Sequence, residues 1–242
     1  METVKKLIAI RKKEHRNHDF ILNAVKNINL YDLLFRFSLL TLGSTISGIG
    51  ATLAIKSTFG ADSVALFWES LNVRFGFTLG TANYIFSFFF LFLVLIIDKQ
   101  YIGVGTVLSP IIQGITMDCM GLHMSIPRNF LVKTNYMVLG VIILAIGCSV
   151  YTFAMLGCGS YLGALFAING RWGYSITRVK WSFDALLIVL SIFFGVFPSL
   201  GPIVSILISG FIIEKTTEIL VKLRSLLFSI KKLSSGNCFR KK

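Results

Sequence analysis

The sequence has few charged residues and is especially poor in acids. Charged side chains make up 14% of the 242 residues, whereas hydrophobic residues make up 55%. Ordinary soluble domains carry about 25% charged residues. A water-soluble fold would leave much of this apolar surface exposed. We therefore predict an integral membrane protein whose solvent is the lipid bilayer.

Sequence signatures of enzymes and metal sites are also missing. The chain contains no Gly-x-Ser-x-Gly, no phosphate-binding loop and no His-Glu-x-x-His. Its four cysteines form no Cys-x-x-Cys pair, and none stands at zinc-ligand spacing to the three histidines. We expect no enzymatic activity, no cofactor and no metal, and we interpret the cysteines as small packing residues.

Basic residues outnumber acids by 24 to 11 and gather near the two ends of the chain. Lys and Arg that flank membrane spans stay preferentially in the cytoplasm. Basic charge is also typical of nucleic-acid binding, but no nucleic-acid motif accompanies it here. We predict that both termini are cytoplasmic, that the number of crossings is even, and that nucleic acid is not a partner.

Six stretches are apolar and close to the ~20 residues that a bilayer-spanning helix needs. Because these runs are continuous and do not alternate with polar residues, we predict helices and no strands. After the last stretch, residues 218–242 form a basic amphipathic tail, which we expect to bind anionic inner-leaflet lipids. A docking helix for a protein partner is the alternative. The stretches are 34–55, 78–97, 102–119, 135–156, 177–197 and 200–214.

An internal repeat divides these spans into two copies. Residues 72–78 read NVRFGFT and residues 169–175 read NGRWGYS, 97 positions later, and several glycines recur at that offset. Each copy holds three spans and one short apolar segment, at 61–75 or 158–172. Since three is odd, the copies must insert in opposite orientations, as in many secondary transporters. Each short segment either re-enters the membrane as a half-helix or lies along its surface.

The predicted fold is thus an all-α integral membrane protein with two inverted three-span repeats. Its five parts are a basic cytoplasmic arm (1–33), a first membrane repeat (34–120), a linker (121–134), a second membrane repeat (135–217) and the tail (218–242).

Several motifs carry a family resemblance. They are GIGATL at 48–53, GFTLGT at 76–81, KQYIGVGT at 99–106 and Gly173-Tyr174-Ser175. They resemble the YczE/YyaS/YitT group of bacterial membrane proteins. That group often carries Pro-x-Asp at the head of each short segment, where this chain has 63–65 and 160–162. The resemblance implies a multi-pass protein of the bacterial cell membrane and no specific activity.

Charged residues inside apolar spans are candidate functional residues, because each costs ~2.5–3.5 kcal/mol at the centre of a membrane helix. Asp184 lies about two turns into the fifth span, and Lys180 precedes it by four residues on the same helix face. The pair either coordinates a solute or a proton, or simply neutralises itself so that the helix can insert.

Two further pairs occupy equivalent places in the repeats. Asp118 and Glu214 stand near the ends of the third and sixth spans, where they are either gating or binding positions or acids exposed to headgroups. Arg74 and Arg171 each precede an aromatic residue and a glycine. They either cap helix ends and bind phosphate headgroups, or hold an anionic solute.

The leading hypothesis is a transporter or permease for an unknown small solute or ion, and the sequence also allows a homodimer. One alternative is a membrane-embedded solute-binding subunit of a larger ATP-driven transporter. Another is a non-transporting scaffold or regulator that acts through its basic tail.

Overall fold

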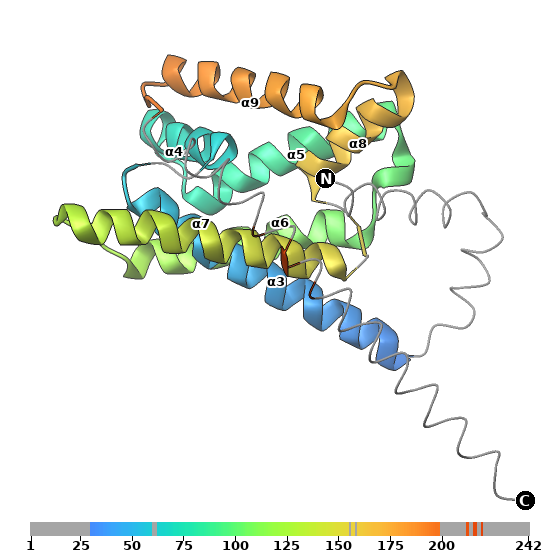
Figure 1. Cartoon of the computed structure of the whole chain (residues 1–242), viewed down its shortest axis with the longest axis horizontal. Coiled ribbons are helices and arrows are strands. Elements are labelled where there is room, and N and C mark those ends of the chain that lie inside the picture. Colours follow the sequence, from blue (N-terminus) through green and yellow to red (C-terminus); the bar gives the residue numbers. More distant parts are fainter. Residues whose placement is uncertain are drawn as a thin grey trace, which may run out of the picture.

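The structure is a computed structural model that describes residues 30–59, 62–154, 156–157 and 159–198, together with 212, 215, 216 and 219. Within these residues the chain forms seven α-helices, one 3-10 helix and no strand, as predicted (Figure 1). The elements are α3 (Leu30–Lys56), α4 (Ser63–Phe75), α5 (Leu79–Ile97), η1 (Lys99–Tyr101), α6 (Val104–His123), α7 (Phe130–Phe153), α8 (Ser160–Trp172) and α9 (Ile176–Phe193).

Three of the helices are long and apolar enough to cross a membrane. They are α3, α5 and α7, with 27, 19 and 24 residues. The helices α6 and α9 lie on the third and fifth predicted spans. The sixth predicted span, Glu214, residues 1–29 and almost all of the tail lie outside the described residues. The long apolar helices identify a membrane protein.

The two short helices begin and end at equivalent positions, 97 residues apart. Each has 13 residues and ends at a glycine in the left-handed conformation, Gly76 at φ 70° and Gly173 at φ 73°. In each, an asparagine side chain, Asn72 or Asn169, donates to the backbone carbonyl just beyond that glycine, at 2.5 and 2.6 Å. The repeated sequence motif is therefore a device for ending a helix.

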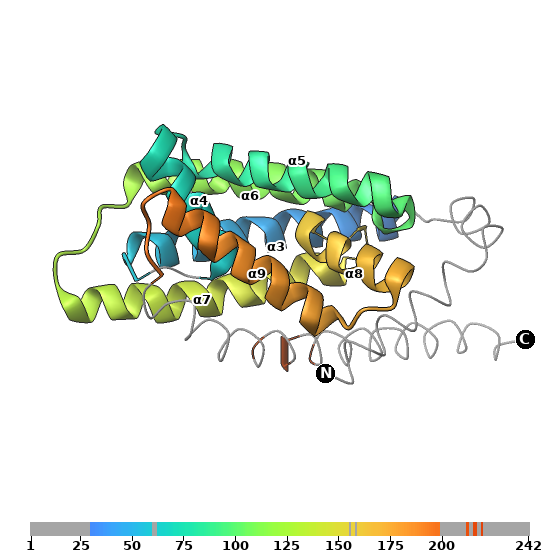
Figure 2. The ribbon, with the colours of Figure 1, turned by 90° about the horizontal axis from the view of Figure 1, so that it is seen from above.

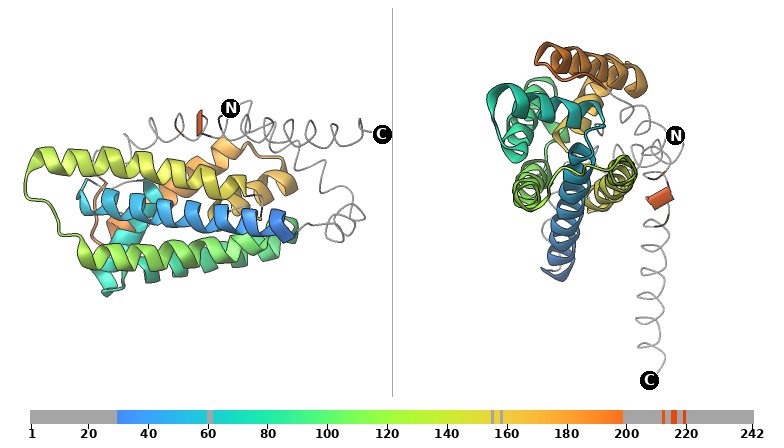
Figure 3. Two further views of the ribbon diagram at one scale, coloured as in Figure 1. Left: turned by 90° about the horizontal axis from the view of Figure 1, so that it is seen from below. Right: turned by 90° about the vertical axis from the view of Figure 1, so that its left-hand side faces the viewer.

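The first helices of the two halves, α3 and α7, pack against each other along much of their length and run in opposite directions (Figures 1 and 3). Glycines allow the close approach, since an added Cβ would collide with the facing backbone. An offset of 97 converts each contact into another with the roles of the helices exchanged, so the interface is approximately two-fold symmetric. The contacts are Gly43 with Tyr151, Gly140 with Ala54, Gly50 with Leu144, and Gly147 with Ser47.

We expect Gly50→Leu to weaken this interface strongly. The new side chain would meet the backbone of Leu144 and the carbonyl of Gly140, and overpacking typically costs ~1–3 kcal/mol. Gly121→Leu is the matched control, because Gly121 is also helical and nothing lies within 4 Å of its Cβ position. The melting temperature in detergent, followed by size-exclusion chromatography after heating, should fall for Gly50→Leu only. Equal melting temperatures would contradict the close contact.

Each short helix packs chiefly on a long helix of the other half, α4 on α9 and α8 on α5 (Figure 2). Along α8, a Cβ on Gly163 would lie 3.6 Å from Val94, and Arg171 reaches the carbonyl of Ile97 at the end of α5. Along α4, the ring of Phe75 lies 5.5 Å from that of Phe194, just beyond α9. Both short helices therefore run outward, from the middle of the bundle towards opposite ends.

Candidate functional site

Asp184 stands halfway along α9 and is 9% exposed. Its Oδ1 atom accepts hydrogen bonds from Ser63 Oγ at 2.6 Å and from the Tyr161 hydroxyl at 2.7 Å. Its Oδ2 atom pairs with the ammonium of Lys180. Ser63 is the first residue of α4 and Tyr161 is the second of α8. One carboxylate therefore joins α9 to the starting ends of both short helices; Figure 1 shows α4 and α8 beside α9.

The Asp184 carboxylate has several partners for a buried acid. A buried charge is costly unless it is paired and hydrogen-bonded, and Asp184 has one cation and two hydroxyl donors. Helix N-termini carry partial positive charge, which adds to the attraction. The Lys180 side chain is 45% exposed, against 12% for Asp184. Lys180 therefore lies nearer the surface of the molecule than the carboxylate with which it pairs.

A second acid, Asp62, lies beside this ion pair. It is the N-cap of α4, and its Oδ1 atom accepts from the Ala65 amide at 2.8 Å. Lys180 and Asp184 are close enough for their charges to act on the Asp62 carboxyl. Asp62 therefore adds a second carboxyl group to the neighbourhood of the ion pair.

Aromatic rings surround the inner side of the site. The Tyr161 ring lies 5.3 Å from that of Phe90, 6.0 Å from Phe86 and 6.3 Å from Phe183. Phe86 and Phe90 belong to the buried core between α4, α5 and α8. These rings exclude water from one side of Asp184, so the Tyr161 hydroxyl is fixed by packing as well as by its hydrogen bond.

Asp118 lies on α6 and forms its hydrogen bonds at the start of α5, not with Asp184. Its carboxylate accepts from the Gly80 amide at 2.7 Å and from Thr78 Oγ1 at 3.0 Å. Thr78 is the N-cap of α5, so Asp118 satisfies free donors at the start of that helix. A side chain at Gly80 would collide with the Asp118 carboxyl. Asp118 therefore fastens α6 to α5 and does not belong to the Asp184 site.

The two arginines lie at the outer ends of the short helices, away from Asp184. Arg171 donates to the carbonyl of Ile97 at 3.1 Å, and its guanidinium lies 5.7 Å from the centroid of the Trp172 ring. It thus caps the last turn of α5. Arg74 stands in the last turn of α4, close in sequence to the start of α5. Neither arginine faces the Asp184 carboxylate.

Comparison with known proteins places the chain in a family. A profile of a family of unknown function, DUF6198, matches residues 34–218, which include both halves and every candidate residue. The chain belongs to the DUF6198 family. An uncharacterized protein of Haemophilus influenzae is 22% identical to this DUF6198 member over 186 residues, or 77% of this chain and 85% of the relative. No solved structure matches.

The other half of this DUF6198 chain holds an uncharged counterpart of the site. The residues 97 positions before Lys180 and Asp184 are Asn83 and Ser87. Ser87 Oγ donates to Asn83 Oδ1 at 3.2 Å across the same single helical turn. The counterpart of Ser63 is Ser160, the first residue of α8. The two pairs therefore have the same spacing along their helices, but only Lys180 and Asp184 carry charge.

The structure adds three residues to the site that the sequence analysis missed: Asp62, Ser63 and Tyr161. Asp62 could be identified from the sequence, because an aspartate before an apolar run is a typical N-cap. The comparison with the Pro-x-Asp motif considered only residues 63–65. Ser63 and Tyr161 carry no local signal, since each reaches Asp184 from a different helix. Among the described residues, no three His, Cys, Asp or Glu side chains gather as a metal site would require.

Proposed function

We propose that the chain is a transporter for a small solute or ion in a bacterial plasma membrane, with six spans arranged as two inverted repeats. The antiparallel, two-fold packing of α3 and α7 supports opposite orientations of the two halves. The helices α6 and α9 would provide two further crossings, and residues 200–214 the sixth. The motifs shared with the YczE/YyaS/YitT group are consistent with such a multi-pass architecture.

The short helices act in this proposal as re-entrant half-helices. Each starts near the middle of the bundle and ends at one of its ends, as a half-helix inserted from one side of the membrane would. Irregular backbone at membrane depth is tolerated only where protein buries it or a cavity lines it. Transporters with inverted repeats commonly place their sites where such discontinuous helices start.

The observation that carries the proposal is that Asp184 accepts hydrogen bonds from the starts of α4 and α8 at once. An ionisable residue at such depth in a membrane protein is by default a candidate functional residue. A change in the state of Asp184, through proton or cation binding, would loosen its bonds to both short helices together. Because those helices lead to opposite ends, one event at Asp184 can bias access towards either side.

In this proposal both termini are cytoplasmic, and the C-terminal tail lies on anionic inner-leaflet lipids. Arg74 would then lie outside the cell and Arg171 inside. A homodimer would need no residue of the Asp184 site.

Flux in proteoliposomes tests the proposal. Purified protein is first screened against a metabolite panel by thermal shift, and radiolabelled forms of the stabilising compounds are then offered to proteoliposomes and to empty liposomes. A transporter by itself should accumulate at least one compound above the empty liposomes. Stabilisation without flux, together with a co-purified ATPase, would favour a solute-binding subunit. Absence of both, with a phenotype lost on deleting 218–242, would favour a scaffold.

A further inference from the structure

An acid on α4 takes no part in the contacts described so far. Glu69 is the seventh of the 13 residues of α4 and is partly buried. No hydrogen bond or ion pair reaches its carboxyl from a residue that the structure describes. The other described acids that are not exposed each accept at least one hydrogen bond: Asp62, Asp98, Asp118 and Asp184. An ionised Glu69 would be a partly buried charge without a partner, and such charges are costly.

The helices that pack against α4 are α9, α5 and α3. The helices α4 and α9 run in the same direction, because Asp184 meets the start of α4 and Phe194 meets its end. The part of α9 beside Glu69 lies between these two residues and has no charged side chain. The ammonium of Lys180 is already paired with Asp184. The neighbouring helix α9 therefore offers Glu69 no cation.

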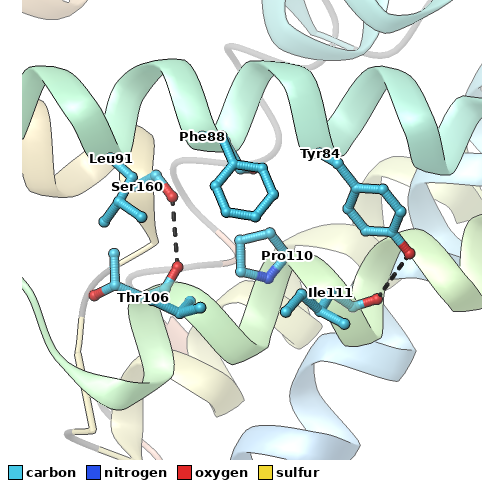
Figure 4. Close-up of a pocket in the computed structure, with 9 residues that line it drawn as sticks. Tyr84, Phe88, Leu91, Thr106, Pro110, Ile111 and Ser160 are labelled. Carbon is cyan, nitrogen blue, oxygen red and sulfur yellow. Dashed lines mark hydrogen bonds between the residues drawn. The ribbon is translucent and has the colours of Figure 1, made fainter.

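The helices α5 and α3 offer no partner either. No residue of α5 is charged, and its one titratable group, the Tyr84 hydroxyl, donates to the Ile111 carbonyl of α6 at 3.2 Å (Figure 4). The remaining ionisable residues of α3, α4 and α9 form no bond with Glu69, and they are Tyr31, Asp32, Arg36, Lys56, Arg74 and Arg178. Within the described part of the chain, Glu69 thus has no fixed counter-ion.

Glu69 stands where α4 passes from its buried start to its exposed end. Leu66, about one turn before it, is 1% exposed, whereas Val73, about one turn after it, is 61% exposed. Ser63, which bonds Asp184, lies six residues before Glu69, or ~9 Å along the helix axis. A proton that arrives from the end of α4 therefore meets Glu69 before it meets Asp184.

The second half of the chain shows that this position does not need an acid for folding. The residue 97 positions after Glu69 is Phe166, on α8. Its ring lies 6.3 Å from that of Tyr101, so an apolar side chain fills the equivalent place by packing. An acid that bonds to no described residue in such a place points to a role beyond folding.

A proton suits this carboxyl better than a metal cation does. Cations such as Ca²⁺ and Mg²⁺ take about six oxygen ligands, and no three His, Cys, Asp or Glu side chains gather among the described residues. A proton needs a single carboxylate oxygen, and once it is bound the carboxyl is neutral and its burial is no longer costly.

We propose that Glu69 is a proton-binding residue whose carboxyl is protonated while α4 is packed as in this structure. It releases the proton to water when the end of α4 opens, and the carboxylate left behind takes up another. This part of the proposal stands without any transported solute. Resting on the transport function proposed above, the same proton is the ion coupled to the movement of the solute.

Infrared spectroscopy tests the protonation without a solute. The full chain in lipid nanodiscs is compared with Glu69→Gln at neutral pH, at which carboxyls in water are ionised. The unmodified chain should show the carbonyl stretch of a protonated carboxyl, and this band should be missing from Glu69→Gln. Asp98→Asn, which changes the N-cap of η1, should keep the band. Identical spectra of the unmodified chain and Glu69→Gln in this region would overturn the proposal.

A pH gradient tests the coupling. The readout is uptake of the radiolabelled compound into proteoliposomes with an imposed gradient, divided by uptake without one. This ratio should exceed one in the unmodified chain and in Asp98→Asn, fall to one in Glu69→Gln, and rise again in Glu69→Asp, which keeps a carboxyl. Equal ratios in the unmodified chain and Glu69→Gln would overturn the coupling. Absence of any flux would reject the transport function, and the infrared band would still decide whether Glu69 binds a proton.

Discussion

Asp184→Asn is expected to abolish solute flux in proteoliposomes. Asparagine has nearly the same size, and its amide oxygen can still accept from Ser63 and Tyr161. It cannot take up a proton or balance the charge of Lys180. Hydrogen bonds to a charged group contribute about 1.5–3 kcal/mol, so flux should fall at least about tenfold. Uptake of the radiolabelled compound identified by thermal shift measures the effect.

A second variant distinguishes a role of the Asp184 carboxylate in transport from a role only in the insertion of α9. If the ion pair merely neutralises itself, the double change Lys180→Gln with Asp184→Asn should restore both folding and flux, since no unpaired charge is left. If Asp184 works in transport, the double variant should regain the elution profile of the folded protein but stay inactive. Normal flux in the double variant would assign Asp184 a structural role.

The control for both is Asp98→Asn. Asp98 is the N-cap of η1, and its carboxylate accepts from the Gln100 amide at 3.0 Å. Asparagine is an equally good N-cap, and Asp98 does not contact the Asp184 site. Its flux should match that of the unmodified chain. A comparable loss in Asp98→Asn would show that removing any acid harms the protein, and the Asp184 result would then lose its meaning.

The local architecture could be read from the sequence because duplication marks equivalent positions. The repeated Asn-x-Arg-aromatic-Gly motif located the ends of α4 and α8 at Phe75 and Trp172, since only glycine adopts the left-handed end at low cost. Helix limits were less accurate. The helix α7 begins at Phe130 and not at 135, because Lys133, Thr134 and Asn135 can continue a helix but do not look like a membrane core. An apolar stretch of sequence shows which part of a helix can contact lipid, and the helix itself can extend beyond that stretch.

The candidate site was predicted only in part. Helical spacing alone brings Lys180 to Asp184, and the structure contains this ion pair, while its role in binding stays a prediction. The role of Asp118 was not predictable, because it depends on Gly80, 38 residues earlier in the chain. Of the two donors to Asp184, Ser63 lies 121 residues away and Tyr161 lies 23 residues away in another helix. Periodicity within one helix contains no information on the contacts that α9 makes with the starts of two other helices.

Cysteines placed at Arg74 and Arg171 are expected to react from opposite sides of the membrane. Both residues are exposed. Arg74 stands near the first residue of α5, and Arg171 bonds the carbonyl of its last residue, Ile97. The 19 residues of α5 span about 28 Å, close to the ~30 Å of a bilayer's hydrocarbon core. A helix that separates the two positions by this length places one in each compartment.

The measurement uses intact cells, a membrane-impermeant maleimide, and a background in which all four native cysteines are replaced. With cytoplasmic termini, Arg74→Cys should react in intact cells and Arg171→Cys only after permeabilisation. Arg128→Cys is a third position that should follow Arg74→Cys. It lies just after α6, whose Asp118 holds the start of α5. Permeabilised cells give the full signal for each variant.

The labelling result also tests whether Asp184 lies between the two compartments. The short helices meet at Asp184 from opposite ends, so Arg74 and Arg171 mark the two exits that lead from that carboxylate. If both cysteines react from one side, α5 does not cross the membrane and Asp184 does not lie at its midplane. No path through the site would then connect the compartments, and even a strong binding signal would indicate a receptor or a subunit. Reaction from opposite sides leaves Asp184 between them, where alternating access requires it to be.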